Sequence, residues 1–458
     1  MTLGPMAPPS PGATAKATGR WPFGFGPRFI TLLVAGFAWL GPAVWDARFI
    51  TAMLAWDALV AIGWGWDLKR LPAPELLTLR RRWSGPAALN AAIDVAVDLE
   101  NAGARPIQAI VLDHPPPSLV DALPRMRLDV DAAGRATARY TVRPRLRGNL
   151  PMGAVHVRYR SRLGLAERWA SAALGQDVRV YPDLAGSQRV TLYLIRSRQI
   201  EQERRLKRRR GLGREFESLR EYRQGDPWRD LCWTASARRG KLITKVYQVE
   251  RDQTVWLVID AGRLLRASLA GLTKLDYAIN AALSLAQVAL HSGDRVGLLA
   301  YGRRPQLCLS PARGAAHLRS LVEGLADVRA EPSEADHLRA ARMLLSIQKR
   351  RSLVIWLTDM ADSAMVPEVV EGASQVGVRH VVLFMAVGQP GLSRAIASSP
   401  ATPARMYRYA AGLEIAERRS LLLSRLSRRG AYTAEVEPAQ VGAVLVNQYL
   451  RIKERGVI

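Results

Sequence analysis

The pattern of hydrophobic and polar positions begins with two apolar segments. Residues 29–44 carry no charge, and residues 49–66 carry only one, that of Asp57. Each segment is close to the lower limit of the roughly 17 to 25 residues with which a helix crosses a bilayer. The pattern predicts a transmembrane helical hairpin over residues 29–66, preceded at residues 1–28 by a flexible arm rich in Pro, Gly, Ala and Ser.

The charges on either side of the hairpin predict its orientation. Arg20 and Arg28 precede it, and a group of basic residues follows it. Because cytoplasmic loops carry an excess of Lys and Arg, we expect a two-pass protein of the inner (cytoplasmic) membrane with its soluble domains in the cytoplasm. Asp57 is interpreted as a helix-pairing or interfacial residue rather than a proton relay. The alternative to a membrane hairpin is a hairpin that packs as part of a soluble protein. The basic residues after the hairpin are Lys69, Arg70, Arg80, Arg81 and Arg82.

Short alternating runs separated by turn residues come next. Apolar and polar positions alternate over residues 91–99, 107–112, 136–142 and 154–159, which is typical of strands with one buried face. Several short strands at this spacing predict an antiparallel β-sandwich of immunoglobulin-like type over residues 72–182. No catalytic arrangement is visible in it, so adhesion or spacing is the expected role.

In the last part of the chain, apolar strands alternate with amphipathic helices. This order predicts a parallel, doubly wound, Rossmann-like α/β sheet over residues 251–458. In such sheets ligands bind beyond the carboxyl ends of the central strands, where Asp260 and Asp359 lie. The expected strands are 255–259, 296–300, 353–357, 380–385 and 432–436, and the expected helices are 275–290, 317–328, 415–428 and 441–452.

Charge adds a question about partners. Lys and Arg exceed Asp and Glu by 66 to 40, a formal net charge of +26. This charge makes nucleic acid, anionic lipid and an acidic protein the candidate partners. Lysine is scarce, and an arginine excess of this kind is common in proteins of GC-rich genomes, so nucleic acid is an unlikely partner. The densest basic run begins at Arg204 and ends at Arg210. Its nearness to a membrane anchor favours lipid over DNA, and a solvated helix face is the simpler interpretation.

Cysteine and histidine exclude two classes of site. Cys232 and Cys308 stand alone, which fits two free thiols in a reducing cytoplasm rather than a disulfide scaffold. The six histidines show no spacing typical of a zinc site.

A basic connector, residues 183–250, joins the sandwich to the α/β domain. Within it, Phe216, Leu219 and Tyr222 fall on one helical face, which predicts a helix ended by Gly225. The Gly-x-Gly before them lacks a preceding strand and a following Lys-Ser/Thr pair, so a P-loop is excluded. The interleaved charges are interpreted as an ion-paired network rather than an acid/base cluster.

This connector resembles the hallmark of a bacterial family, domain of unknown function 58. The family shows a glycine-rich start, an E-F-x-x-L-R-x-Y core, a Gly-Asp pair and an Arg-x-Ile-x-Trp step, and here Leu231 replaces the isoleucine. The resemblance extends to the anchor, to the sandwich with its string RPRLRGNLPMGAVHVRYRSRLGL, and to the α/β domain. The expected interaction signature is Glu215, Phe216, Leu219, Arg220, Tyr222, Gly225, Asp226, Arg229, Trp233 and Arg238.

The α/β domain also resembles the von Willebrand factor A domain. That domain binds a metal through a D-x-S-x-S motif, a loop threonine and a later aspartate. Asp260 and Asp359 match the two acidic positions, but Gly262 and Leu264 replace the serines and no threonine is available at residues 311–316. We expect a degenerate site with no cofactor, or with Mg²⁺ as the alternative. Otherwise the two aspartates cap helices or bind backbone amides.

Together these resemblances imply a membrane-anchored, non-enzymatic protein-interaction component. The implied partner is a MoxR-type AAA+ ATPase, in a cell-envelope or stress-related process. One alternative is a metal-dependent hydrolase that uses Asp260 and Asp359. The other is binding of anionic lipid or nucleic acid by the run from Arg204 to Arg210.

Overall fold

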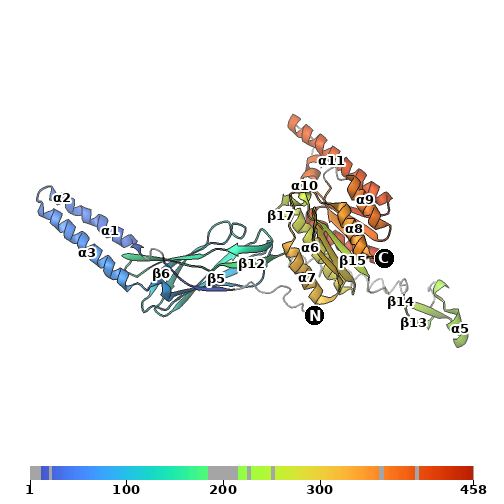
Figure 1. The fold of residues 1–458 in the computed structure, drawn as a ribbon, viewed down its shortest axis with the longest axis horizontal. Coiled ribbons are helices and arrows are strands. Elements are labelled where there is room, and N and C mark those ends of the chain that lie inside the picture. The colour runs from blue at the N-terminus through green and yellow to red at the C-terminus, as the bar shows by residue number, and fades with distance from the viewer. Residues whose placement is uncertain are drawn as a thin grey trace. The chain divides into compact units, whose positions relative to one another are not determined.

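A computed structural model describes residues 12–19, 23–183, 215–223, 228–248, 253–360, 366–397 and 402–456. Contacts within the chain divide it into two units, Met1–Tyr181 and Pro182–Ile458. The first holds a helical hairpin and a β-structure, and the second holds an α/β sheet (Figure 1).

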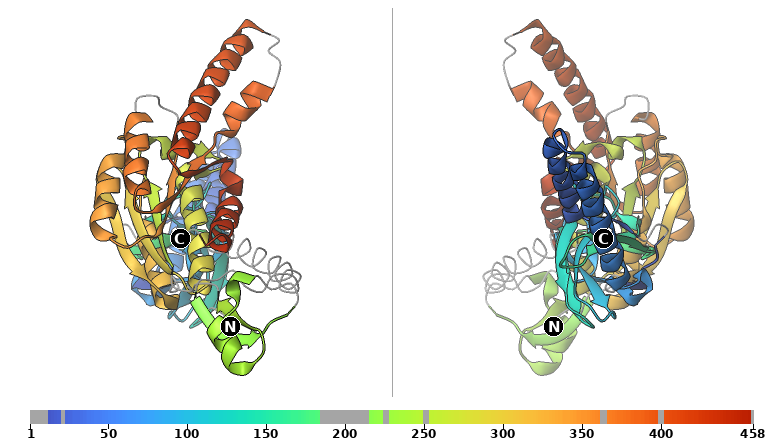
Figure 2. Two further views of the ribbon diagram at one scale, coloured as in Figure 1. Left: turned by 90° about the vertical axis from the view of Figure 1, so that its right-hand side faces the viewer. Right: turned by 90° about the vertical axis from the view of Figure 1, so that its left-hand side faces the viewer.

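The hairpin consists of α1 (Pro27–Gly36), a 3₁₀ turn (Phe37–Trp39), α2 (Leu40–Ala43) and α3 (Arg48–Arg70). Its two arms lie side by side in Figures 1 and 2. Within the described residues, the segment Arg48–Leu76 is the one helix long and apolar enough to cross a membrane by length and composition, and Pro27–Ala43 is a shorter apolar helix. The structure therefore supports one candidate span, and the two-pass arrangement stays a prediction.

The arms of the hairpin touch through a glycine. The indole Nε1 of Trp56 donates to the carbonyl of Leu32 at 2.8 Å. A Cβ added to Gly36 would stand 2.8 Å from Oδ1 of Asp57, so the carboxylate lies against the backbone of the opposite arm. The position of Asp57 agrees with a helix-pairing residue.

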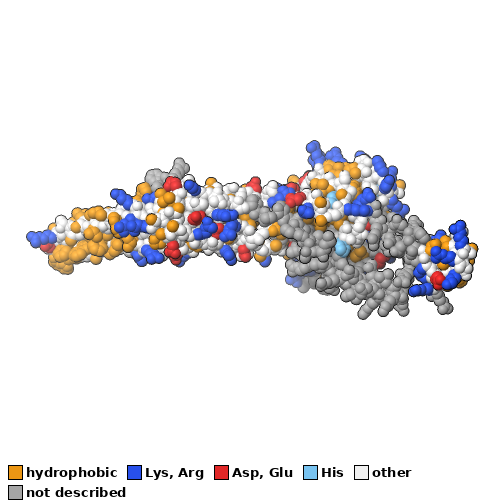
Figure 3. Space-filling view, turned by 90° about the horizontal axis from the view of Figure 1, so that it is seen from below, with side chains coloured by type: hydrophobic (Ala, Val, Ile, Leu, Met, Phe, Trp, Pro, Cys, Tyr) orange, Lys and Arg blue, Asp and Glu red, His pale blue; other side chains and the backbone are white. Residues whose placement is uncertain are grey.

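The outer surface of the hairpin is apolar. Twelve large hydrophobic side chains in it are exposed, and Figure 3 shows hydrophobic side chains covering this end of the unit. A contiguous apolar surface of this kind is unusual on a soluble monomer. The residues are Ile30, Val34, Phe37, Trp39, Leu40, Val44, Trp45, Ile50, Leu54, Leu59, Ile62 and Trp66.

The rest of the first unit is built from sheets whose neighbouring strands are antiparallel, except for the parallel pair β4 and β12. One has the order β1-β3-β5-β8 and the other β2-β11-β10-β6-β7, and a smaller sheet has the order β4-β12-β9. The two larger sheets share one core, in which Leu79 and Val97 of the first meet Val111 and Val157 of the second. The strands are β1 (Ala13–Lys16), β2 (Gly24–Phe25), β3 (Leu77–Trp83), β4 (Ala87–Ala88), β5 (Ile93–Asn101), β6 (Ile107–Asp113), β7 (Arg125–Val130), β8 (Arg135–Val142), β9 (Gly148–Met152), β10 (Val155–Arg160), β11 (Ala166–Ala172) and β12 (Gln176–Tyr181), with a 3₁₀ turn at Pro74–Leu76 before β3.

The structure corrects one expectation about this unit in part. Part of the predicted flexible arm is ordered, because β1 pairs with β3 and β2 pairs with β11. Arg81, one of the basic residues that follow the hairpin, lies on the buried side of β3 and forms an ion pair with Asp113, both side chains having no exposed surface. An arginine inside a strand follows the strand's alternation, whatever the sign of its neighbours.

The second unit contains a six-stranded sheet of order β19-β18-β15-β20-β21-β22. All neighbouring strands are parallel except β18 and β19, which form an antiparallel pair. Counted in chain order within the sheet, the strands stand 3-2-1-4-5-6, so the order reverses between β15 and β20. The strands are β15 (Thr254–Asp260), β18 (Arg295–Tyr301), β19 (Pro305–Ala312), β20 (Leu353–Thr358), β21 (Val381–Val387) and β22 (Tyr432–Val436), and β16 (Ser268–Leu269) pairs with β17 (Leu272–Thr273) outside the sheet.

Helices cover both faces of this sheet (Figure 1). α8, α9 and α11 pack on the face that presents Trp256 and Trp356, and α6 packs on the other face with α7 and α12. α11 extends beyond the sheet with α10 beside it (Figure 2). The helices are α6 (Lys274–His291), α7 (Gly314–Asp327), α8 (His337–Ile347), α9 (Val366–Gly377), α10 (Pro390–Ala397), α11 (Pro403–Arg428) and α12 (Val441–Glu454), with 3₁₀ turns at Arg263–Arg266 and Pro438–Gln440.

Candidate functional site

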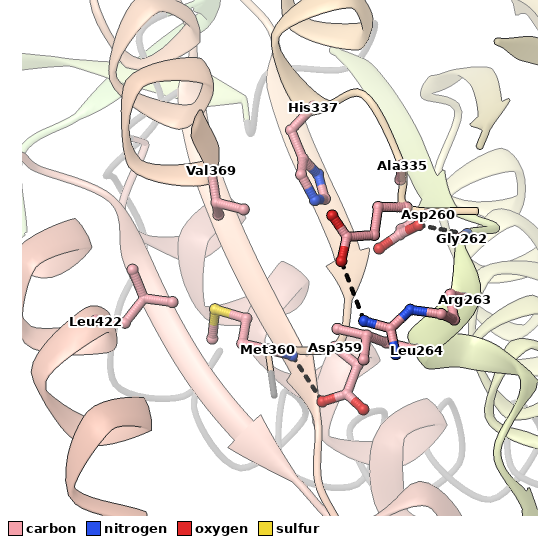
Figure 4. A pocket seen from close by; sticks show the side chains of 11 residues that line it. Asp260, Gly262, Arg263, Leu264, Ala335, His337, Asp359, Met360, Val369 and Leu422 are labelled. Carbon is pink, nitrogen blue, oxygen red and sulfur yellow. Dashed lines mark hydrogen bonds and ion pairs between the residues drawn. The ribbon is translucent and has the colours of Figure 1, made fainter. Parts of the chain in front are cut away.

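Asp260 and Asp359 lie together at the carboxyl edge of the sheet, as expected. Asp260 is the last residue of β15, and Asp359 follows Thr358, the last residue of β20. The two strands are parallel neighbours, and the strand order reverses between them. This is the position where doubly wound sheets bind ligands. Both side chains are buried and line one small cavity (Figure 4).

Asp260 accepts hydrogen bonds from neutral donors. The backbone N–H of Gly262 donates at 2.7 Å and the hydroxyl of Thr358 at 2.6 Å. Burial raises the pKa of Asp260, although His337 nearby and the two donors favour its charged form. A Cβ at position 262 would stand 2.9 Å from the backbone nitrogen of Ala335. This close approach of the backbone explains why a glycine stands at position 262, where the D-x-S-x-S metal motif has its first serine.

Asp359 is neutralised by two buried cations. Its Oδ2 lies 2.5 Å from Nζ of Lys274, and its Oδ1 lies 3.0 Å from Nη1 of Arg419. The backbone N–H of Met360 donates to Oδ1 at 2.6 Å. Arg419 also lies 2.8 Å from the carboxylate of Glu435. All of the oxygens of Asp359 are therefore engaged by groups of the protein.

Lys274 is held in place by the start of α6. Thr273 caps the helix and exchanges hydrogen bonds with Asp276 in a capping box, which points the lysine that follows Thr273 toward the sheet edge. Burial lowers the pKa of Lys274 and outweighs the attraction of Asp359. Sequence reasoning missed both cations, because they lie 85 and 60 residues from Asp359 in the chain.

His337 lines the same cavity and ends a hydrogen-bonded chain of aromatic side chains. The indole of Trp356 donates to the hydroxyl of Tyr301 at 2.6 Å, and Tyr301 in turn lies 2.8 Å from Nδ1 of His337. Which of the two groups donates in this second contact depends on the tautomer of His337. Burial lowers the pKa of His337 and raises that of Tyr301. The sequence singled out none of the three, because each stands within an ordinary apolar strand or helix.

The cavity between these groups is too small for a substrate. Its volume is about 20 Å³, roughly the room that one water molecule needs. Leu264, Met360, Val369 and Leu422 form much of its lining (Figure 4). The carboxyl group of Asp260 and the imidazole of His337 both line this cavity.

The residues at this edge do not fit a magnesium ion. Mg²⁺ requires oxygen ligands in octahedral geometry, whereas here the two carboxylates are occupied by a hydroxyl, backbone amides and two cations. Across the part of the chain that the structure describes, no group of three or more His, Cys, Asp or Glu side chains could hold a metal. The binding of backbone amides, one of the alternatives for these aspartates, occurs at both of them.

The signature segment folds differently from the expectation. The predicted helix is instead β13 (Glu215–Glu221), which pairs antiparallel with β14 (Ile243–Gln248) with a bulge after Phe216. The strand takes its hydrogen bonds from a segment more than 20 residues away, and that pairing overrides the local helical spacing. Between the strands lie a 3₁₀ turn (Trp228–Asp230) and α5 (Trp233–Arg239).

A serine ties α5 to β14. The hydroxyl of Ser236 donates to the carbonyl of Cys232 at 2.9 Å and accepts from the backbone N–H of Ile243 at 2.8 Å. Cys232 N–H donates to the carbonyl of Ile243 at 2.8 Å. These bonds close the segment into a small unit of strand, turn, helix and strand, and Ser236 was not among the residues predicted from the sequence.

Several signature side chains are exposed. Trp228 and Trp233 expose 67% and 65% of their surface, and the rings of Tyr222 and Trp228 lie 5.7 Å apart. Arg229 and Arg238 are exposed too. Of the remaining predicted residues, Leu219 is partly exposed, Arg220 donates to the carbonyl of Glu221, the backbones of Glu215 and Phe216 pair with β14, and Gly225 and Asp226 lie outside the described residues, as does the run from Arg204 to Arg210.

Part of the chain matches a family model. Residues 218–391 match the family described as "Protein of unknown function DUF58". The DUF58 match begins inside β13 and ends in α10, so it covers most of the signature segment and much of the α/β sheet. The resemblance is confirmed for this region, and the hairpin and the sandwich lie outside the match. A family of unknown function brings no activity with it.

Relatives and solved structures add little about activity. Uncharacterized proteins Mb1516 of Mycobacterium bovis and MT1527 and Rv1480 of Mycobacterium tuberculosis are 24% identical over 182 residues, 39% of this chain. The match spans 56% of the length of these relatives. The conserved hypothetical protein BatB from Bacteroides thetaiotaomicron is 14% identical over 44% of this chain and 99% of its own, with a TM-score of 0.31. Proximal thread matrix protein 1 from the mussel byssus is 9% identical over 44% of this chain and 47% of its own, with a TM-score of 0.29.

Proposed function

We propose that this chain is a membrane-anchored, non-enzymatic protein-interaction component, whose signature segment binds a partner protein. The observation that carries the proposal is the exposure of Trp228 and Trp233 beside the arginines of the signature. Tryptophan and arginine are the residues most enriched among those that dominate the energy of protein interfaces. The absence of room for a substrate in the cavity beside Asp260 supports binding rather than catalysis.

The α/β sheet is proposed to be a von Willebrand factor A-like domain without its metal ion. Its strand order and the two aspartates at the switch between β15 and β20 support this interpretation. Lys274 and Arg419 supply to Asp359 the positive charge that a metal would otherwise bring. The domain is then a rigid carrier for the signature segment.

The hairpin is proposed to hold the protein in the cytoplasmic membrane by two passes, with the soluble domains in the cytoplasm. The length of α3 and the exposed apolar surface of both arms support insertion. The orientation rests on the basic residues that flank the hairpin, chiefly Arg28, Lys69 and Arg70, all of which are exposed.

The partner is proposed to be a MoxR-type AAA+ ATPase acting in a cell-envelope or stress-related process. This part of the proposal derives from the resemblance to the DUF58 family, for which the match over residues 218–391 is the support. The charge of +26 favours a partner with an acidic surface.

Binding to the purified MoxR-type ATPase of the same organism tests the proposal. The full chain in a neutral detergent is immobilised and the ATPase is titrated over it with ATP. We expect the double variant Trp228→Ala/Trp233→Ala to weaken binding at least tenfold, since each tryptophan supplies apolar area at the interface. Tyr407→Ala, which removes an aromatic side chain that is 79% exposed on α11, is the matched control and should bind like the wild type. No binding by the wild type, or equal loss with the control, would count against the proposal.

A further inference from the structure

The base of the hairpin is joined to the sandwich by a tight loop at residues 161–165. This loop carries the end of the string RYRSRLGL, which the proposed function does not use. Arg28 at the start of α1 donates from Nη1 to the carbonyls of Arg162 and Leu163, each at 3.0 Å. The backbone N–H of Gly26 donates to the carbonyl of Leu165 at 2.8 Å. The loop is therefore bound to the first arm of the hairpin through its backbone.

The second arm is bound to the same loop. Asp67, buried near the end of α3, accepts at Oδ2 from the backbone N–H groups of Leu165 and Ala166, at 3.2 and 2.9 Å. A Cβ at Gly26 would stand 2.1 Å from the carbonyl oxygen of Gly164, and Gly164 itself has φ = +68°. Neither glycine tolerates a side chain, so the contact has one geometry.

Aromatic side chains surround this joint. The ring of Phe25 lies 4.8 Å from that of Phe29 and 5.2 Å from that of Trp64. The indole of Trp64 donates to the carbonyl of Gly24 at 3.1 Å. The exposed Trp169 of β11 stands close to the same Gly24. Aromatic rings with polar edges gather at the level of lipid headgroups in membrane proteins.

Exposed cations and apolar side chains lie near the same loop. The guanidinium of Arg70 lies 3.3 Å from the centre of the Trp66 ring. Leu163 exposes 47% of its surface at the tip of the loop, next to the exposed Arg162. Figure 3 shows Lys and Arg side chains where the hydrophobic surface of the hairpin ends. We call the set the collar: Phe23, Phe25, Arg28, Trp66, Lys69, Arg70, Arg162, Leu163 and Trp169.

We infer that the collar binds the headgroups of anionic phospholipids and fixes the sandwich on the membrane surface. The inference rests on the proposed membrane anchoring. Aliphatic and aromatic side chains reach the acyl boundary while four cations stand at headgroup level, which is the arrangement that anionic lipid attracts. The tight loop supplies the rigidity, because both arms are hydrogen-bonded to it.

Collisional quenching locates the collar relative to the bilayer. The full chain, with Cys232 and Cys308 changed to serine, is reconstituted into vesicles of equal parts phosphatidylcholine and phosphatidylglycerol. A bimane label on the L163C variant should be quenched by lipids that carry a nitroxide on the headgroup. The matched control is L146C, because Leu146 is 56% exposed and lies far from the hairpin. Leu146 follows β8, and the last residue of β8, Val142, pairs with Ile93 at the end of β5 that is far from the hairpin. Equal quenching of the two labels would overturn the inference.

The preference of the protein for anionic over zwitterionic lipid tests the role of the cations in the collar. Binding of dioctanoyl-phosphatidylglycerol and dioctanoyl-phosphatidylcholine to the full chain in neutral detergent is compared by native mass spectrometry. Each cation near a headgroup contributes about fivefold, so Arg70→Gln/Arg162→Gln should lower the preference for the anionic lipid by about 25-fold. Arg125→Gln/Arg143→Gln removes two exposed arginines from the far ends of β7 and β8 and should leave it unchanged. An unchanged preference in the collar variant would overturn the inference.

Alkaline carbonate extraction separates this inference from the anchoring on which it rests. Release of the wild-type chain from the vesicles would refute the anchoring itself. Retention of the chain, together with an unquenched L163C label, would leave the anchoring standing and refute only the collar.

Discussion

Nζ of Lys274 lies 2.5 Å from Oδ2 of Asp359, and both side chains are almost wholly buried. The pair joins the start of α6 to the end of β20, across the point where the strand order of the sheet reverses. With Arg419 on the other oxygen, each carboxylate oxygen faces a buried cation. The pair is the basis of two predictions.

Replacing Lys274 by methionine should destabilise the second unit. The change leaves Asp359 buried with one cation instead of two, and loss of one partner of a buried ion pair costs about 3 kcal/mol. The unfolding midpoint of the full chain in detergent, followed by circular dichroism, should fall by roughly 6 to 12 °C. The control is Lys241→Met, because Lys241 and its partner Glu221 are both largely exposed. Adding Asp359→Asn to Lys274→Met should recover part of the loss, and strictly additive effects would contradict the pairing.

Divalent cations should not stabilise the wild-type protein. With Asp260 and Asp359 occupied by internal donors, Mg²⁺ and Mn²⁺ find no free carboxylate at this edge of the sheet. A ligand at the concentration of its dissociation constant stabilises by about 0.4 kcal/mol. We therefore expect no shift of the unfolding midpoint, and no binding heat in calorimetry, at millimolar metal. A metal-dependent rise that EDTA reverses would contradict the assignment.

His337 should make stability fall in mild acid. Burial lowers its pKa below the ordinary value near 6.5 in the folded state, so the unfolded state binds a proton that the folded state refuses. The stabilisation is complete above the unfolded pKa and is lost as the pH falls through about 6.5 toward the folded value. His337→Gln should reduce the slope of stability against pH between about 6.5 and 5.5 by up to roughly 1.4 kcal/mol per pH unit. Parallel curves for the variant and the wild type would show that the imidazole does not titrate in this way.

Arg81 should be essential to the sandwich. Its guanidinium donates to Asp113 and to the carbonyls of Leu174 and Gly153, the last two at 3.0 Å. Arg81→Met leaves a buried carboxylate and two buried carbonyls without these donors, which should cost about 3 to 5 kcal/mol. Arg135→Met is the control, because Arg135 and its partner Glu100 are about half exposed. A similar midpoint for both variants in thermal unfolding would refute the role of the buried pair.

The two arms of the hairpin should separate when Gly36 gains a side chain. A Cβ there would stand 2.8 Å from Oδ1 of Asp57 and 2.9 Å from Cδ1 of Trp56. Gly36→Ala should push the arms apart and speed hydrogen exchange of the amides of α1 in detergent micelles. Gly41→Ala meets no atom within 4 Å and should leave exchange the same or slower. Faster exchange in both variants would indicate a general effect of alanine rather than a contact.

The sequence predicted those parts of the fold that can be recognised from the hydrophobic pattern of a single segment. β22 was expected at 432–436 and is observed at Tyr432–Val436, and β15 was expected at 255–259 and is observed at Thr254–Asp260. The uniformly apolar run within β15 identifies a buried strand without reference to the rest of the chain. β19 was missed, because its two prolines are typical of a loop and its place in the sheet depends on pairing with β18.

The same distinction applies to the site. Asp260 and Asp359 could be found because each follows a recognisable strand. Lys274 and Arg419 could not, because nothing in their neighbourhoods shows that two helices bring them to one carboxylate. The helix predicted through Phe216 and Leu219 failed for a related reason, since its backbone hydrogen bonds are made with β14.

The hydrogen bonds from the loop at Leu165 to Asp67 couple the orientation of α3 to that of the sandwich. A transmembrane helix answers a change in bilayer thickness by changing its tilt. α3 runs without interruption from Arg48 to Arg70, and its last turn is bonded to the backbone of the sandwich. With the hairpin inserted as proposed, a thinner bilayer that tilts the hairpin would tilt the sandwich through the same angle, so the angle of the sandwich would follow the thickness of the membrane.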